Sequence, residues 1–134
     1  MAVFHDLQLM SLAVLMLASQ LDVVSAAVRV SSLYGRGLTG DPFGNAPDPY
    51  VKVWCGSTFA GQTEYLKDNA YPRWSAEFNF PKCKANDNLK IEMWDRDEVY
   101  DDLLGTFYQT LQNGVSNPTY SLSAGTLTFN LEVK

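Results

Sequence analysis

Apolar and polar residues alternate in short runs along most of the chain after residue 27. The clearest run is 89–94, in which Leu89, Ile91 and Met93 point one way and the residues between them point the other. A period of two is typical of a strand with one buried face, and no helical period of useful length is present. The expected strands are 28–34, 49–55, 58–67, 74–80, 89–94, 103–111, 119–122 and 126–133. Short strands at this spacing predict an all-β protein, an antiparallel eight-stranded β-sandwich.

Acidic residues follow the 89–94 run directly. Asp95 and Asp97 stand at the strand end, and Asp101 and Asp102 stand just before the next apolar run. Two such charges about 4 Å apart repel by roughly 1 kcal/mol in water and about 4 kcal/mol at an effective dielectric near 20. A hard cation removes that repulsion, and Ca²⁺ prefers several oxygen ligands of this kind. A solvated acidic turn without an ion is the alternative.

An EF-hand does not explain these acids. With Asp95 as its first position, the loop would need an oxygen ligand at Val99, a glycine at Tyr100 and a bidentate glutamate at Thr106. The flanking residues are also strand-like. Any calcium site here therefore needs further acids from elsewhere in the chain.

The first residues are predicted to be a secretory signal peptide. Residues 7–18 are nearly all apolar but too few to span a bilayer comfortably, and the small residues Ser25, Ala26 and Ala27 follow. We expect cleavage after Ala26, with Ala27 as the alternative position, which gives a signal peptide over 1–26 and one mature domain over 27–134. An uncleaved anchor is the alternative, because the segment before the apolar run carries no lysine or arginine.

Removal of residues 1–26 changes the charge and the chemistry that is available. The segment contains two aspartates and the only histidine, His5, so the formal net charge goes from −5 to −3. An acidic balance argues against nucleic acid as a partner. Without histidine, a Ser-His-Asp or Cys-His arrangement is excluded, and an exposed loop supplies no evident pKa separation for Asp101 and Asp102. We expect the protein not to be an enzyme.

The two cysteines, Cys55 and Cys83, are predicted to form a disulfide. An even pair in an oxidising compartment is usually bridged, and closing a loop of this size stabilises by roughly 3–4 kcal/mol in the chain-entropy model. A pair of free thiols is the alternative. Two cysteines without a histidine do not make a zinc site.

The mature chain resembles a C2 domain. The matching segments are Gly37-Leu38 with Asp41, Asp48-Pro49-Tyr50-Val51-Lys52-Val53, the turn 69–74, Trp94-Asp95-Arg96-Asp97 and Asp102-Leu103-Leu104-Gly105. Within that family it is most similar to C2 domains of the perforin type, which also match at 37–41, 101–106 and 125–129. That likeness implies the permuted, type II strand order. We expect a free-standing, secreted domain, because the chain is too short to hold a pore-forming domain as well.

One departure concerns cysteines. Perforin-type C2 domains carry a cysteine pair that would fall near Phe107 and near Tyr120 or Ser121, where this chain has no cysteine. The expected bridge between Cys55 and Cys83 would then be a substitute for it. The acidic loop is also about one residue shorter than usual, so Asp101 and Asp102 are both retained as candidate ligands.

The resemblance implies a calcium-dependent membrane module. Five aspartates would gather at one end of the sandwich and hold about two Ca²⁺ ions, with backbone carbonyls near Pro42 and Arg96: Asp41, Asp48, Asp95, Asp97 and Asp102. Incompletely coordinated ions would then accept lipid phosphate oxygens. We therefore expect a secreted, extracellular monomer that docks on phospholipid membranes.

Apolar side chains at the loop tips would add insertion into the membrane. The candidates are Phe43, Tyr71, Val99 and Tyr100. The three tryptophans, Trp54, Trp74 and Trp94, are expected in the core or on strand faces. An extracellular protein-interaction module, in which Ca²⁺ is structural or absent, is the alternative function.

Overall fold

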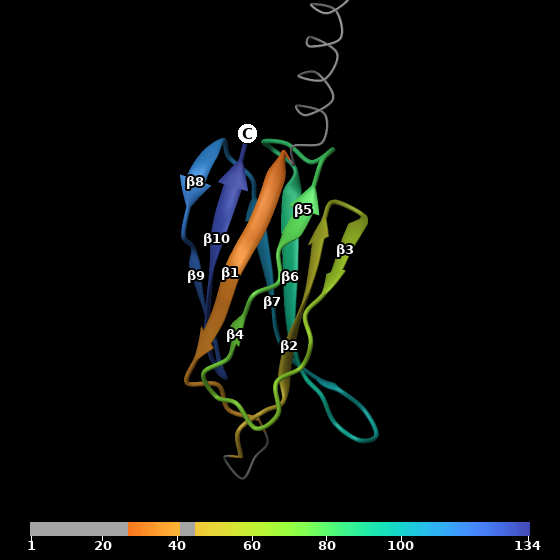
Figure 1. The fold of residues 1–134 in the computed structure, drawn as a ribbon, viewed down its shortest axis with the longest axis vertical. Helices are drawn as coiled ribbons and strands as arrows, with labels where there is room; N and C mark the ends of the chain where they lie inside the picture. Colours follow the sequence, from red (N-terminus) through yellow and green to blue (C-terminus); the bar gives the residue numbers. More distant parts are fainter. Residues whose placement is uncertain (1–26, 41–44) are drawn as a thin grey trace, which may run out of the picture.

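A computed structural model describes residues 27–40 and 45–134. This part of the chain contains strands, turns and loops and no helix, and the strands form two antiparallel sheets packed face to face (Figure 1). Among these residues there is accordingly no helix long and apolar enough to cross a membrane. The all-β antiparallel sandwich predicted from the alternation pattern is confirmed.

The first sheet is built around two long neighbouring strands. Its members are β1 (Val28–Arg36), β4 (Arg73–Trp74), β5 (Phe78–Phe80), β8 (Gly114–Ser116), β9 (Thr119–Leu122) and β10 (Gly125–Val133). β1 pairs with β10 along its length, β4 and β5 both pair with β1, and β8 and β9 both pair with β10. Six strands therefore fill only four positions across the sheet.

The second sheet has four strands in the order β3-β2-β6-β7. They are β2 (Pro49–Cys55), β3 (Thr58–Gln62), β6 (Asn88–Asp95) and β7 (Asp102–Thr110). β2 and β6 pair from Pro49 opposite Asp95 to Cys55 opposite Leu89. Their antiparallel course places Asp95 at one end of the sandwich and Cys55 at the other.

The described residues form ten strands instead of the expected eight, because one expected strand is divided in two and one short strand was not expected. The segment 74–80 alternates in burial throughout, but its pairing with β1 is interrupted between Trp74 and Phe78. The cause is a bulge in β1, where the register shifts between Ser31 and Tyr34 and Ser32 has a φ of 52°. On the other side, 114–116 adds a short strand that the sequence pattern missed. Each of the eight predicted segments contains a strand, but the one predicted over 58–67 ends at Gln62.

The core lies between the two sheets and follows the predicted alternation. Val51, Val53, Ile91 and Met93 of the second sheet are fully or almost fully buried. From the first sheet the buried apolar side chains are Val28, Val30, Leu33, Trp74, Phe78, Phe80, Leu127, Phe129, Leu131 and Val133. Trp54 and Trp94 lie half-buried on the outer face of the second sheet, so the three tryptophans divide between core and strand face.

An aromatic stack connects the two sheets at one edge. The ring of Phe107 on β7 lies 4.7 Å from the ring of Tyr120 on β9, and Tyr120 lies 5.9 Å from Phe129 on β10. Phe107 and Tyr120 are the positions near which the family resemblance would have placed a cysteine pair. Stacked rings therefore make the contact there, adding roughly 0.5–1.5 kcal/mol per pair beyond their buried area.

The two ends of the described chain meet. The backbone N–H of Lys134 donates to the carbonyl of Ala27 at 2.8 Å, beside the paired residues Val28 and Val133. This contact lies at the same end of the sandwich as Cys55, opposite the loop 96–101 (Figure 1). The type II strand order stays a prediction from the resemblance.

Candidate functional site

Three loops carry the predicted site at one end of the sandwich. They are the segments between β1 and β2, between β3 and β4, and between β6 and β7, the last standing out at the lower right in Figure 1. We call this region the acidic end and define it by its described aspartates: Asp48, Asp95, Asp97, Asp101 and Asp102. Asp41, Pro42 and Phe43 were predicted to contribute here and lie outside the described residues.

Asp48 joins all three loops through backbone and side-chain contacts. Its N–H donates to Oδ1 of Asp95 at 2.8 Å, and its own Oδ1 accepts from the N–H of Asp68 at 2.8 Å. The N–H of Arg96 donates to the carbonyl of Asp48 at 2.9 Å. These bonds hold the start of β2, the end of β6 and the 67–72 segment in one arrangement.

Asp101 braces its own loop with both carboxylate oxygens. Oδ1 accepts from the N–H of Asp97 at 3.0 Å, and Oδ2 accepts from the hydroxyl of Tyr50. The Tyr50 hydroxyl and the Asp97 N–H hold the pKa of the Asp101 carboxyl below its usual value. Burial and the same carboxylate raise the pKa of Tyr50. The hydroxyl therefore stays protonated and continues to donate to the loop.

The pairing of β6 with β7 gives Asp102 a position that differs from that of Asp101. Asp102 lies directly opposite Asp95 in the ladder, so the two side chains leave the sheet on the same side. Asp101 precedes the strand and faces Tyr50 instead. The two aspartates, which the sequence left interchangeable, thus occupy distinct environments.

The carboxyl of Asp95, in the acidic end, has a pKa that is raised by burial and by its acidic neighbours. Burial is the largest factor that raises the pKa of its carboxyl above the usual value. The N–H of Asp48 lowers that pKa, whereas the negative charges of Asp48, Asp102 and Asp97 raise it further. The net shift is upward, so the folded protein disfavours the ionised form of Asp95. A bound cation would reverse that preference.

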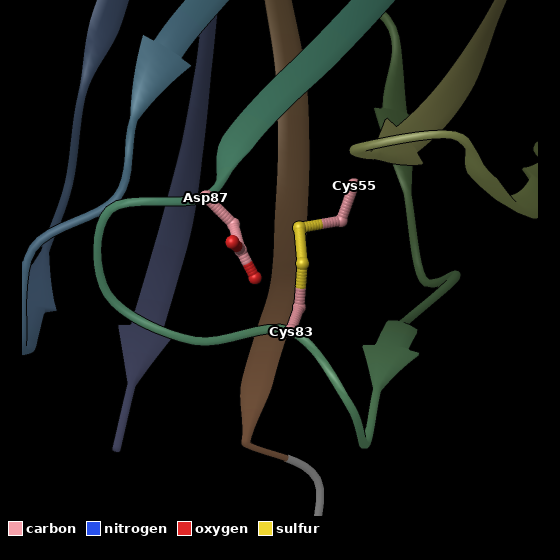
Figure 2. A group of neighbouring side chains, drawn as sticks. All are labelled: Cys55, Cys83 and Asp87. Atoms are coloured by element: carbon pink, nitrogen blue, oxygen red, sulfur yellow. A yellow bond between two sulfur atoms is a disulfide. The ribbon is translucent and has the colours of Figure 1, made fainter.

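The described acids do not converge as tightly as the cysteine region does. Within residues 27–40 and 45–134, one group of three potential metal ligands has all its donor atoms within 4.8 Å: Cys55, Cys83 and Asp87. Its two sulfurs are bonded to each other, with Asp87 beside them, as Figure 2 shows. A disulfide offers no thiolate, so this group is not a soft-metal site. The predicted bridge between Cys55 and Cys83 is confirmed.

Three of the four predicted membrane-contact residues are described and exposed. The exposed fractions are 67% for Tyr71, 79% for Val99 and 81% for Tyr100. Val99 and Tyr100 lie in the loop that Asp97 and Asp101 hold, and Tyr71 lies in the turn that follows Asp68. Apolar side chains are therefore exposed beside the acids.

Sequence reasoning missed two contacts that organise these loops. The first is the bond from Tyr50 to Asp101, although the alternation of 49–55 already placed Tyr50 and Lys52 on one outer face. The second is the Arg96 guanidinium, which lies 4.0 Å from the centre of the Tyr65 ring. Nothing in the sequence pattern indicated that Tyr65 would reach the loop after β6.

Comparison with protein families identifies the architecture. The C2 domain family model matches residues 26–125, which is most of the chain. The chain belongs to the C2 domain family. C2 domains commonly bind Ca²⁺ and phospholipid, and the acidic end lies in the loops that carry the family motifs.

Relatives of this C2 domain agree with the assignment. Human perforin-1 is 33% identical over 115 residues, which cover 81% of this chain and 20% of perforin-1. A solved structure titled "Structure of a C2 domain" has a TM-score of 0.71 and 36% identity, covering 78% of this chain and 94% of that chain. The chain spans a fifth or less of the length of the curated relatives it matches.

A calcium-bound structure is among those with the same fold. The C2A and C2B domains of extended synaptotagmin 2, solved with calcium, have a TM-score of 0.63 and 24% identity to this chain. The match covers 80% of this chain and 45% of that one. At this identity the likeness concerns the fold alone.

Proposed function

We propose that this C2 domain docks on phospholipid membranes in a calcium-dependent way through its acidic end. The observation that carries the proposal is the arrangement of that end. Asp48, Asp97 and Asp102 act electrostatically on a partly buried Asp95, and exposed apolar side chains stand on the adjacent loops. Acids beside apolar tips suit an ion that neutralises the loops before they meet an anionic surface.

The donor set fits Ca²⁺. Every candidate side chain is a carboxylate, and hard oxygen ligands in flexible loops are what calcium prefers. We assign Asp48, Asp95, Asp97 and Asp102 as ligands, with Asp41 as a further one, and give Asp101 the role of bracing the loop. When bound, the ion would supply positive charge and open coordination positions for phosphate oxygens. Extended synaptotagmin 2, whose C2 domains share this fold, has been solved with calcium bound.

The exposed loop residues would then enter the interfacial region of the bilayer. Each large apolar side chain that becomes fully buried contributes roughly 1.5–3 kcal/mol. Tyr71, Val99 and Tyr100 are the described candidates, and Phe43 is the fourth. Their insertion would lengthen the time that the domain stays on the membrane.

We also propose that the protein acts outside the cell and is not an enzyme. The disulfide between Cys55 and Cys83 is consistent with an oxidising compartment. Extracellular calcium modules typically bind with dissociation constants of about 10⁻⁴–10⁻³ M, which suits the few ligands available here. The absence of histidine after residue 26 removes the side chain that most often serves as an acid–base catalyst.

Liposome co-sedimentation of the chain from Ala27 to Lys134 tests the docking. Zwitterionic and anionic vesicles are compared at about 1 mM calcium and in excess chelator. We expect the protein to pellet with anionic vesicles only in calcium, and Asp97→Asn to abolish pelleting. Glu77→Gln is the matched control, because it removes one exposed carboxylate from the segment between β4 and β5, away from the acidic end.

One result would replace this function with a protein-interaction role. If the protein stays in the supernatant while calcium still raises its melting temperature, the ions stabilise the fold and do not recruit it to membranes. If neither pelleting nor melting responds to calcium, the acidic end is a solvated acidic surface.

A further inference from the structure

A groove runs over the outer face of the first sheet, close to the acidic end. Two adjoining pockets of about 330 and 500 Å³ share Tyr34, Arg36 and Tyr71 in their linings. Arg73 lines the first pocket, and Thr126 is among the hydroxyl residues of the second. We call this feature the arginine groove. It lies on a different sheet from Tyr50 and Asp95 and is not part of the calcium site proposed above.

The strand register explains why these side chains share one face. Tyr34 of β1 lies opposite Arg73 of β4 on one side and opposite Thr128 of β10 on the other. Arg36, two residues after Tyr34, lies opposite Thr126. Residues two apart on a strand share a face, so Arg36 and Arg73 are diagonal neighbours on the outer surface. The strand pairing therefore places the two arginines on neighbouring strands, diagonally adjacent on the outer face of the sheet.

The charges on this face are paired at one end and unpaired at the other. Near the disulfide end, Arg29 lies 2.8 Å from Glu132 and 3.7 Å from Glu77. Arg36 and Arg73 form no ion pair with any carboxylate among the described residues. Arg73 instead lies 5.0 Å from the centre of the Tyr34 ring, which orients it without neutralising it.

The wall formed by Tyr71 is held by backbone bonds. The N–H groups of Gly35 and Leu38 donate to the carbonyls of Pro72 at 2.9 Å and Ala70 at 3.0 Å. The N–H of Tyr71 donates to Oδ1 of Asn69 at 2.9 Å. The turn is therefore tied to the end of β1, and the groove needs no rearrangement to form.

We propose that the arginine groove binds the phosphate monoester of an anionic lipid headgroup. Two unpaired guanidiniums match the charge of a monoester, about −1.5 to −2 near neutral pH, better than that of a singly charged diester. The hydroxyls of Thr126, Tyr34 and Tyr71 would supply further donors, whereas those of Thr119 and Thr128 bond each other at 2.8 Å. The lipid source follows from Tyr71, which lines the groove, is exposed and is also one of the proposed membrane-contact residues. In that respect the inference rests on the docking proposed above.

The first experiment measures affinity for phosphatidylcholine–phosphatidylserine vesicles in calcium, with and without a few per cent of phosphatidic acid. Phosphatidic acid should raise the affinity of the wild-type protein roughly tenfold, a gain that Arg36→Gln/Arg73→Gln loses and Arg36→Lys/Arg73→Lys keeps only in part. Arg29→Gln is the control from the same face and should keep the whole gain. An equal gain in wild type and Arg36→Gln/Arg73→Gln would overturn the proposal.

The second experiment separates lipid from free phosphate and the groove from the calcium site. In excess chelator, the Nε signals of Arg36 and Arg73 are followed by NMR during titration with monomeric short-chain phosphatidic acid or with inorganic phosphate. Tighter binding of the short-chain lipid supports the proposal, and equal or tighter binding of inorganic phosphate overturns it. A wild-type protein that fails to bind vesicles without phosphatidic acid would refute the docking, whereas this titration reads the groove independently.

Discussion

The two ends of this sandwich are built by opposite means. At one end, a covalent bond joins Cys55 at the end of β2 to Cys83 in the turn before β6, and both cysteines are buried (Figure 2). At the acidic end, neighbouring carboxylates repel one another and are held by single hydrogen bonds from Asp48, Asp97 and Tyr50. The covalent brace and the proposed calcium site thus lie at opposite ends of the strands. Changes at the first end should alter the free energy of unfolding, and changes at the second should alter calcium affinity.

The largest expected effect comes from the disulfide end. Cys55→Ala/Cys83→Ala should lower the free energy of unfolding by roughly 3–4 kcal/mol, because the closed loop between the two cysteines is released in the unfolded chain. Urea denaturation measures the change. Calcium affinity, measured by isothermal titration at a temperature where both proteins are folded, should remain within about twofold. A large loss of calcium affinity would show that the two ends are coupled.

The next effect comes from the hydroxyl that braces the acidic loop. Tyr50→Phe removes the donor to Asp101 and should cost about 1 kcal/mol in the free energy of unfolding, less than a fully buried bond to a charged group. Calcium affinity should fall several-fold, since the loop loses its preformed shape. Tyr108→Phe is the matched control, because Tyr108 is exposed on β7 and should lose neither stability nor affinity. Equal affinities for Tyr50→Phe and wild type would contradict the bracing role.

Asp95→Asn should raise the free energy of unfolding, whereas the two changes above should lower it. Because the pKa of Asp95 is raised in the folded protein, its ionisation lowers stability as pH rises from the unfolded pKa through the folded one. The amide keeps the oxygen that accepts from Asp48 and removes the charge. Without calcium we expect a gain below about 1 kcal/mol after solvent screening, and a loss of calcium binding. Lower stability in chelator would contradict this account of the charges.

The smallest effect on stability is expected at the loop tips. Val99→Ser/Tyr100→Ser replaces two exposed side chains and should leave the urea midpoint unchanged. Dissociation from anionic vesicles in calcium, followed by stopped-flow fluorescence, should become at least tenfold faster because less apolar surface is buried. Calcium affinity measured without vesicles should be unchanged, which would show that the calcium site is intact. Unchanged dissociation would place membrane contact elsewhere.

Much of the fold could be predicted from the sequence because alternation directly reports burial. Val51, Val53 and Cys55 are buried as their spacing indicated, and β2 pairs with β6 over the predicted residues. The interruption between β4 and β5 could not be predicted, because it arises from a bulge at Ser32 on a different strand. Local patterns report which side chains point inward, whereas hydrogen-bond register depends on the partner strand.

The sequence allowed the aspartates of the site to be predicted, but not the different position that each one takes. The motif around Asp95 and Asp97 predicted both at a strand end; β6 ends at Asp95, and Asp97 lies in the loop that follows. Asp101 and Asp102 differ only in the structure, where one accepts from Tyr50 and the other lies opposite Asp95. The assignment of aspartates of the acidic end as calcium ligands stays a prediction. The arginine groove was missed because Arg36 and Arg73 are far apart in sequence and meet only through strand pairing.

The meeting of Ala27 and Lys134 has a practical consequence for attachment. Both residues lie at the disulfide end, and the nine-residue strand β10 extends roughly 30 Å from there toward the loops. A fluorescent reporter or a second protein fused at either point would stand clear of a bilayer engaged by the opposite end. The same proximity suits the domain to insertion within a host protein, since entry and exit of the chain are adjacent.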